Sequence, residues 1–238
     1  MWLALKFKVL RQRLSYLLHG NAQGVSMGYI SKSGSVILPT FDELVLRFPL
    51  IILADLKEGQ SLYDEIVERQ SGSIYPENYD SGSKLNAFLY AYIKAYDPKV
   101  IVETGVANGI TTNVIMRALS ERQSVLHSFD IDSRTKASFA GEGNWVFHLL
   151  EPPFHKNLKS VSETIEEVDL WLHDSNHGGL WQSYEYALAL TKLSPQGILV
   201  SDDVDASTAW ANYVSGLPGE SYIVHDLRKV IGFYVPGE

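Results

Sequence analysis

Acidic side chains recur along this chain, each close behind a run of largely apolar residues. They are Glu103, Asp130, Glu151, Asp174, Asp202 and Asp203. A histidine, His177, follows three residues after Asp174. Carboxylates suit a hard divalent cation such as Mg²⁺, and a histidine can accept a proton near neutral pH. If the fold brings these groups together, the sequence predicts a polar site with the means for metal binding and acid–base chemistry.

The clearest local motif is the β-branched run 100–102 followed by Glu103, Gly105 and Gly109. Unbroken β-branched residues are typical of a strand buried on both faces of a parallel sheet. Glycine can adopt backbone angles closed to other residues and leaves the main chain open to a ligand. The motif predicts a strand, a sharp turn and a helix start that bind a nucleotide-like ligand. An ordinary tight turn is the alternative.

Strand and helix patterns alternate from residue 84 onward. Further strands are expected at 125–130, 145–150, 168–173 and 198–201, and helices at 85–96, 111–120 and 181–193. This alternation indicates parallel strands joined by helices that cover both faces of the sheet. Two final apolar runs, 222–226 and 230–235, flank a short charged turn and predict a β-hairpin. We therefore expect an α/β fold with a doubly wound, seven-stranded, mostly parallel, Rossmann-like sheet that ends in an antiparallel hairpin.

Residues 1–83 have a different pattern from the rest of the chain. We expect them to form an N-terminal helical extension with a loop, which leaves 84–238 as the binding domain. Helices are predicted over 41–56 and 61–69. The polar stretch 70–83 is rich in Ser, Gly, Tyr and Asn, and is predicted to be the boundary or a mobile loop.

The first 20 residues carry four basic side chains and no acidic one. Apolar residues recur along them at spacings of three and four, which is typical of one face of an amphipathic helix. We expect this helix to dock on its own domain or to pair with a second subunit in a homo-oligomer. Peripheral contact of 1–20 with an anionic membrane is the less favoured alternative. The later apolar run 44–56 is interrupted by Arg47 and Pro49 and is too short to span a bilayer.

Composition excludes several functional classes. The formal net charge is −8, which argues against a general nucleic-acid binder because phosphates need a basic surface. The chain contains no cysteine, so disulfides, zinc–thiolate sites and thiol nucleophiles are excluded, and a cytoplasmic location is expected. Hydrophobic residues make up 45% of the sequence, which is enough for a sizeable core. From the negative net charge we expect no nucleic-acid partner.

The predicted sheet places the acids at one edge. In an open parallel sheet, ligands bind beyond the carboxyl ends of the strands, where these acids fall. Asp130 ends the second strand and is placed to accept hydrogen bonds from ribose hydroxyls, while Asp132 is expected to cap the next helix. The alternative is that both only cap or solvate the strand end.

The ordered motifs resemble the class I S-adenosylmethionine-dependent methyltransferases over residues 84–238. They are the stretch from Glu103 to Gly109, Asp130, the pair Asp202-Asp203 and the terminal hairpin. Another set is similar to the branch of small-molecule O-methyltransferases that includes macrocin-type and catechol-type enzymes: His173-Asp174-Ser175-Asn176-His177, Tyr184 and 197–203. A nicotinamide-dinucleotide oxidoreductase is the competing interpretation, but its turn usually needs a glycine where this chain has Ala107.

The resemblance implies methyl transfer from S-adenosylmethionine to a hydroxyl of a small-molecule acceptor. It implies that the cofactor is held by Glu103, Gly105, Asn108, Gly109, Asp130 and Asp174, with Glu103 and the backbone around Gly105 at the amino-acid portion and Asp130 at the ribose. Glu151 is one choice for the adenine contact. A non-catalytic methyltransferase-like ligand sensor or assembly protein is the alternative function.

The same resemblance implies the groups that perform the chemistry. Asp174, Asp202 and Asp203 would hold Mg²⁺, which would orient the acceptor hydroxyl and make it easier to deprotonate. His177, together with Asp174, would take the proton of that hydroxyl. The alternative for Asp202 and Asp203 is that they cap a helix beginning near residue 206.

Overall fold

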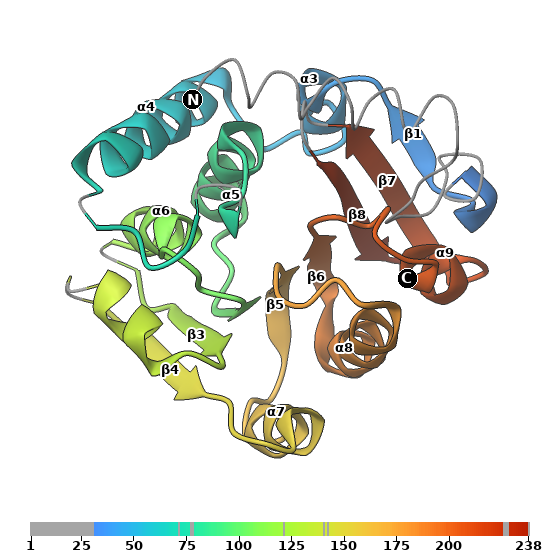
Figure 1. Ribbon diagram of the computed structural model, residues 1–238. Coiled ribbons are helices and arrows are strands. Elements are labelled where there is room, and N and C mark those ends of the chain that lie inside the picture. Colours follow the sequence, from blue (N-terminus) through green and yellow to red (C-terminus); the bar gives the residue numbers. More distant parts are fainter. Residues whose placement is uncertain are drawn as a thin grey trace.

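The computed structural model describes residues 31–70, 72–76, 79–120, 122–139, 141, 143–225 and 229–237. Their strands form one eight-stranded sheet in the order β1-β7-β8-β6-β5-β2-β3-β4, with helices on both faces (Figure 1). Neighbouring strands run parallel except for β8, which is antiparallel to both β6 and β7. The predicted α/β fold with a mostly parallel sheet and a terminal antiparallel hairpin is confirmed.

The elements follow one another in a βα alternation after residue 83. The strands are β1 (Val36–Leu38), β2 (Val100–Thr104), β3 (Val125–Asp130), β4 (Trp145–Leu149), β5 (Val168–His173), β6 (Leu193–Ser201), β7 (Gly219–His225) and β8 (Val230–Pro236). The α-helices are α3 (Phe41–Val45), α4 (Leu53–Arg69), α5 (Ser83–Tyr96), α6 (Ile110–Ala118), α7 (Phe154–Ser162), α8 (Gly179–Lys192) and α9 (Ala209–Val214), and short 3₁₀ helices are η1 (Ser31–Ser33) and η3 (Ser133–Ser138).

The sheet has one strand more than predicted. β1 lies beside β7 at the edge of the sheet, with Val36 opposite Tyr222 and Leu38 opposite Val224. It comes from the part of the chain expected to be a helical extension. Three residues are too few to show the alternation that identifies a strand in a sequence. The division of the chain into 1–83 and 84–238 stays a prediction.

The helix predicted over 41–56 is in fact two helices. α3 begins after Thr40, whose hydroxyl accepts a hydrogen bond from the Glu43 amide at 3.3 Å, and it ends at Val45. Pro49 lies between α3 and α4. Because proline has no amide hydrogen and disfavours helical angles in the residue before it, a continuous helix cannot pass this point. The second predicted helix, 61–69, is the C-terminal part of α4.

The central strands bury both of their faces. Ile101 on β2 belongs to the core cluster that also contains residues of α4, α5 and α6, whereas its neighbour Val102 belongs to the cluster that contains residues of α7, α8 and α9. Leu170 and Trp171 divide in the same way on β5, and all four side chains are fully buried. Burial of such a side chain is worth about 1.5–3 kcal/mol, so the ends of β2 and β5 are firmly positioned. The expectation for 100–102 is confirmed.

Two expectations fall on residues that the structure does not describe. The amphipathic segment 1–20 lies outside the described residues, and so does the charged hairpin turn 226–228. Among the residues that are described, no helix combines the length and the hydropathy needed to cross a bilayer.

Candidate active site

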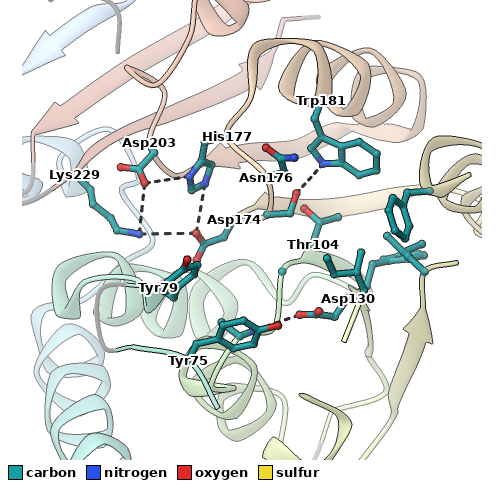
Figure 2. Close-up of a pocket in the computed structure, with 17 residues that line it drawn as sticks. Tyr75, Tyr79, Thr104, Asp130, Asp174, Asn176, His177, Trp181, Asp203 and Lys229 are labelled. Carbon is teal, nitrogen blue, oxygen red and sulfur yellow. Dashed lines mark hydrogen bonds and ion pairs between the residues drawn. The ribbon is translucent and has the colours of Figure 1, made fainter. Parts of the chain in front are cut away.

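A cavity of about 520 Å³ lies at the carboxyl ends of the parallel strands (Figure 2). β2 contributes Thr104 and the following turn, β3 contributes Asp130, and the segments after β5 and β6 contribute Asp174 and Asp203. The remaining lining comes from Tyr75, Tyr79, Gly105, Ala107, Phe129, Ile131, Leu150, Phe154, Ser175, Asn176, His177, Trp181 and Lys229. Of the strand-end acids predicted from the sequence, three therefore meet at this cavity: Asp130, Asp174 and Asp203.

The glycine turn is shaped by close packing against β5. Gly105 has a φ of +87°, and a Cβ atom there would lie 2.1 Å from the carbonyl oxygen of Asp174. Gly109 has a φ of +76°, and a Cβ there would lie 2.3 Å from the Cβ of Ser138. Glycine is needed at both positions. Gly105 lines the cavity, whereas Gly109 is not part of the lining and lets α6 start against η3.

Asp130 lies at the cavity wall and organises the turn. Its Oδ2 accepts hydrogen bonds from the amides of Val106 at 2.8 Å and Ala107 at 3.3 Å, and its Oδ1 accepts one from Asp132 at 2.8 Å. A carboxylate oxygen can accept about two hydrogen bonds, so Oδ2 is fully used by the turn while Oδ1 keeps capacity for a ligand hydroxyl. Asp132 accepts a hydrogen bond from the Arg134 amide at 2.9 Å and caps η3, which confirms its predicted role.

Glu103 lies behind the turn and does not line the cavity. Its Oε2 accepts hydrogen bonds from the hydroxyls of Thr112 at 2.7 Å and Ser128 at 2.6 Å, while Oε1 has no hydrogen-bond partner among the described residues. Complete burial raises the pKa of Glu103 to about 7. Its predicted support of the cofactor would act through the turn rather than by contact, and the role stays a prediction.

Asn108 also lies outside the cavity lining, and its side chain fastens the segment before α5 to the turn. Its Nδ2 donates to the carbonyl of Tyr75 and to Oδ2 of Asp80, both at 3.0 Å, and its Oδ1 accepts from the Tyr75 amide at 2.8 Å. These bonds hold Tyr75 and Tyr79 at the cavity. Asn108 therefore shapes the predicted cofactor site indirectly.

His177 lies between two carboxylates on the opposite side of the cavity (Figure 2). Its Nδ1 is 3.2 Å from Oδ2 of Asp203, and its Nε2 is 3.8 Å from Oδ1 of Asp174. Nε2 is buried and has no hydrogen-bond partner among the described residues. Burial lowers the pKa of His177 to about 4, so the ring is neutral at pH 7 and can accept a proton.

Lys229 is a site residue that the sequence reasoning missed. Its Nζ forms an ion pair with Oδ2 of Asp202 and lies 3.9 Å from Oδ1 of Asp174 and 3.8 Å from Oδ2 of Asp203. Burial lowers the pKa of Lys229, but the three carboxylates outweigh burial and the pKa is raised. Lys229 follows a short charged turn between two strands, where a lysine is expected to be exposed, and no signal in the sequence shows its burial.

The three predicted metal ligands surround this lysine. Asp174 and Asp203 line the cavity, whereas Asp202 is fully buried behind them and does not. Burial raises the pKa of Asp202, but the facing Lys229 charge outweighs burial and the pKa is lowered. Within the described ranges, no group of three or more His, Cys, Asp or Glu side chains is arranged to hold a metal ion. The arrangement differs from an open magnesium site, and magnesium stays a prediction for this chain.

The alternative of helix capping does not apply to Asp202 and Asp203. The next helix, α9, starts only at Ala209, and its first amide donates to the hydroxyl of Ser207 at 3.0 Å. Glu151, the choice for an adenine contact, is exposed and absent from the cavity lining.

A second buried network supports the wall formed by α8. Glu185 stands in no motif of the sequence, yet its Oε1 lies 2.9 Å from Nδ1 of His173. Its Oε2 accepts hydrogen bonds from Ser175 at 3.0 Å and from the indole of Trp181 at 2.9 Å. Burial raises the pKa of Glu185, but His173 and the hydrogen bonds outweigh burial and the pKa is lowered. This network fixes Ser175 and Trp181 at the cavity.

The chain is similar in sequence and structure to known methyltransferases. Residues 102–204 match the model of a protein family described as a methyltransferase domain. No curated protein matches the sequence. The SAH-bound methyltransferase PaMTH1 from Podospora anserina is 14% identical with a TM-score of 0.57, and the alignment covers 86% of this chain and 100% of that one.

Two further solved structures share the fold at similar levels. TomG, an O-methyltransferase from Streptomyces achromogenes involved in tomaymycin synthesis and solved with SAM, is 13% identical with a TM-score of 0.55, covering 84% of this chain and 97% of that one. MycE, from the mycinamycin biosynthetic pathway and solved with Mg, SAH and mycinamycin VI, is 13% identical with a TM-score of 0.56, covering 84% of this chain and 64% of that one.

Proposed function

Because residues 102–204 match the model of a methyltransferase domain and the sheet is mostly parallel with a terminal antiparallel hairpin, we propose that the protein is an S-adenosylmethionine-dependent O-methyltransferase that acts on a small molecule. One observation carries this proposal. Asp130, a carboxylate that suits a ribose, ends β3, and His177, a neutral base that suits an acceptor hydroxyl, follows β5, and both line the same cavity. A cavity of about 520 Å³ is in the range of sites for small ligands, which is about 300–1,000 Å³.

The side of the cavity near β2 and β3 fits the proposed cofactor. Gly105 offers backbone without a side chain, which suits the approach of an amino-acid group. Asp130 offers the remaining acceptor site of Oδ1 to a ribose hydroxyl. The apolar side chains of Ile131, Leu150 and Phe154 stand next to it and suit the flat face of a purine. S-adenosylmethionine would supply an electrophilic methyl carbon there.

The opposite side fits an acceptor hydroxyl. Neutral His177 would accept the proton of this hydroxyl at Nε2, the nitrogen without a partner among the described residues. Asp203 faces Nδ1 at 3.2 Å and would hold the ring in the tautomer that keeps Nε2 free. Ser81 donates to Oδ2 of Asp174 at 2.6 Å, so Oδ1 of Asp174 is directed to the reaction side. Positioning of the two reactants would supply much of the rate acceleration.

Binding and turnover measurements test this proposal. In isothermal titration we expect S-adenosylmethionine and its demethylated product to bind, and NADH not to bind. Asp130→Ala should abolish binding, because it removes the acceptors for the ribose. Binding of NADH in their place would overturn the proposal and favour the oxidoreductase. Methyl transfer is then assayed with labelled cofactor on a panel of small-molecule alcohols and phenols. Cofactor binding without transfer to any member would favour the non-catalytic alternative.

The remaining functional expectations concern partners and location. The absence of a nucleic-acid partner, a cytoplasmic location and an oligomer formed through 1–20 all stay predictions. Sedimentation with anionic vesicles, comparing the full chain with a variant in which the basic residues of 1–20 are neutralised, would distinguish membrane contact from docking or pairing.

A further inference from the structure

Lys229 stands at the centre of the acidic cluster. Its Nζ is within 3.9 Å of carboxylate oxygens from three aspartates, which follow β5 and β6, while Lys229 itself precedes β8. Only a tenth of its side chain is exposed, yet it lines the cavity. A buried ammonium stays charged only where nearby acids compensate for the loss of water, as they do here. The cluster therefore has a resident cation supplied by the chain.

The position of this ammonium conflicts with a divalent ion at the same acids. Mg²⁺ requires oxygen ligands at about 2.0–2.1 Å in octahedral geometry and usually keeps several waters. Asp202, one of the three acids, is fully buried and paired with Lys229. An ion that used Asp202 would have to displace Nζ, and an ion beside Nζ would be repelled by its charge.

We propose that Lys229 is a catalytic residue that takes the place of a metal ion, donating a hydrogen bond to the acceptor oxygen while His177 removes its proton. The inference rests on the proposed methyltransferase function. An ammonium has three N–H donors. Its ion pair with Asp202 uses one, and the other two acids lie at 3.8 and 3.9 Å, beyond hydrogen-bond distance. Among the described residues no other acceptor is recorded for Nζ, so donors remain for a ligand in the cavity.

The geometry places the base and the cation around one point. Oδ1 of Asp174 is 3.8 Å from Nε2 of His177 and 3.9 Å from Nζ of Lys229 (Figure 2). An acceptor hydroxyl beside this oxygen is reached by both groups. As its proton moves to Nε2, negative charge grows on the acceptor oxygen next to an ammonium that is already in place. Preorganised charge of this kind stabilises a transition state without reorganisation. Lys229 keeps its own protons throughout.

Metal dependence is the first test. Wild-type protein is treated with EDTA, dialysed and assayed for methyl transfer over a magnesium titration. We expect full activity after EDTA and less than a twofold change on adding magnesium. Loss of activity with EDTA that magnesium restores would overturn the inference. Binding of SAH to the wild type is measured in parallel: if SAH does not bind, the proposed function itself fails, and if it binds, an EDTA effect contradicts only the role of Lys229.

Substitution of the lysine is the second test. We expect Lys229→Met to lower kcat by about 10²- to 10³-fold, with SAH affinity within threefold of the wild type. Lys229→Arg should recover part of the loss. Unchanged kcat in Lys229→Met would overturn the inference.

Two further variants control for folding. Lys229→Met leaves Asp202 charged and buried, so the double variant Lys229→Met/Asp202→Asn removes both members of the pair and should fold even if the single variant does not. It should show the same loss of kcat, and wild-type kcat in this folded variant would contradict the role of Lys229. The matched control is Lys192→Met. Lys192 is a partly buried lysine whose Nζ donates to the carbonyl of Ile165 at 2.8 Å outside the cavity, and its loss should leave kcat unchanged.

Discussion

Gly105 and Asp174 belong to the ends of adjacent parallel strands and approach so closely that a Cβ on Gly105 would lie 2.1 Å from the Asp174 carbonyl oxygen. The Asp174 amide also donates to the carbonyl of Thr104 at 3.0 Å, and the Gly105 amide donates to Phe129 at 2.8 Å. The turn that would hold the cofactor and the segment that carries the reaction chemistry are therefore joined through backbone. A side chain at Gly105 would separate the two halves of the site.

Gly105→Ala should accordingly destabilise the protein by more than about 3 kcal/mol, through left-handed strain and a backbone clash together. Gly72→Ala is the matched control. Gly72 has a φ of +84°, close to the +87° of Gly105, but its Cβ position is open. This control should lose only about 1–2 kcal/mol for the backbone angle. The free energies of unfolding come from urea titration, and equal losses in the two variants would show that the close approach is not real.

Glu103 should make stability depend on pH. Its pKa is about 7 in the folded protein, compared with an ordinary value of 4.5. Between these values the folded state holds a proton that the unfolded state has released, so stability falls as the pH rises from about 4.5 to 7 and levels off above that. The difference between the two pKa values corresponds to a total change of about 3 kcal/mol in the free energy of unfolding.

The measurement compares the wild type with Glu103→Gln, which cannot ionise. From pH 5 to pH 8, the free energy of unfolding of the wild type should fall by about 2.5 kcal/mol relative to Glu103→Gln. In the control variant Glu167→Gln, at an exposed position, the free energy of unfolding should change with pH as it does in the wild type. Parallel curves for the wild type and Glu103→Gln would mean that Glu103 has an ordinary pKa.

Asn108 should control access to the cavity rather than chemistry. Asn108→Ala removes three hydrogen bonds to the segment that carries Tyr75 and Tyr79. We expect a loss of about 1–3 kcal/mol in stability and weaker SAH binding, with kcat reduced less than threefold at saturating cofactor. Asn212→Ala, on an exposed helix position, should change neither property. A large loss of kcat with unchanged SAH affinity would contradict this assignment.

Most of the fold could be predicted from the sequence because the patterns that mark strands are local. β3 at Val125–Asp130 and β5 at Val168–His173 have the predicted bounds, since an apolar run followed by an acid marks both ends of a buried strand. Such runs also placed Asp130, Asp174 and Asp203 at one cavity. They could not show that Glu103 and Asp202 turn away from it, because a residue that ends a strand can point to either side.

The residues that were missed depend on contacts between distant parts of the chain. Lys229 is buried only because β8 lies beside β6, which brings it to Asp202. Ser81 reaches Asp174, 93 residues later, from the segment just before α5. Neither contact leaves a periodic pattern in the sequence. Composition and spacing identify which groups carry charge, whereas the tertiary fold decides which of them are paired.

His177 should be needed for methyl transfer and not for cofactor binding. His177→Ala removes the proton acceptor, so kcat should fall by about 10²- to 10⁴-fold while SAH affinity stays within threefold. Because burial lowers the pKa of His177 to about 4, its protonation should reduce the wild-type kcat only as the pH falls through about 4, well below the 6.5 of an ordinary histidine. His155→Ala, on α7 outside this cavity, should behave as the wild type. An NMR titration of the His177 ring with a midpoint near pH 6.5 would show that the ring is not shielded from solvent as the structure indicates.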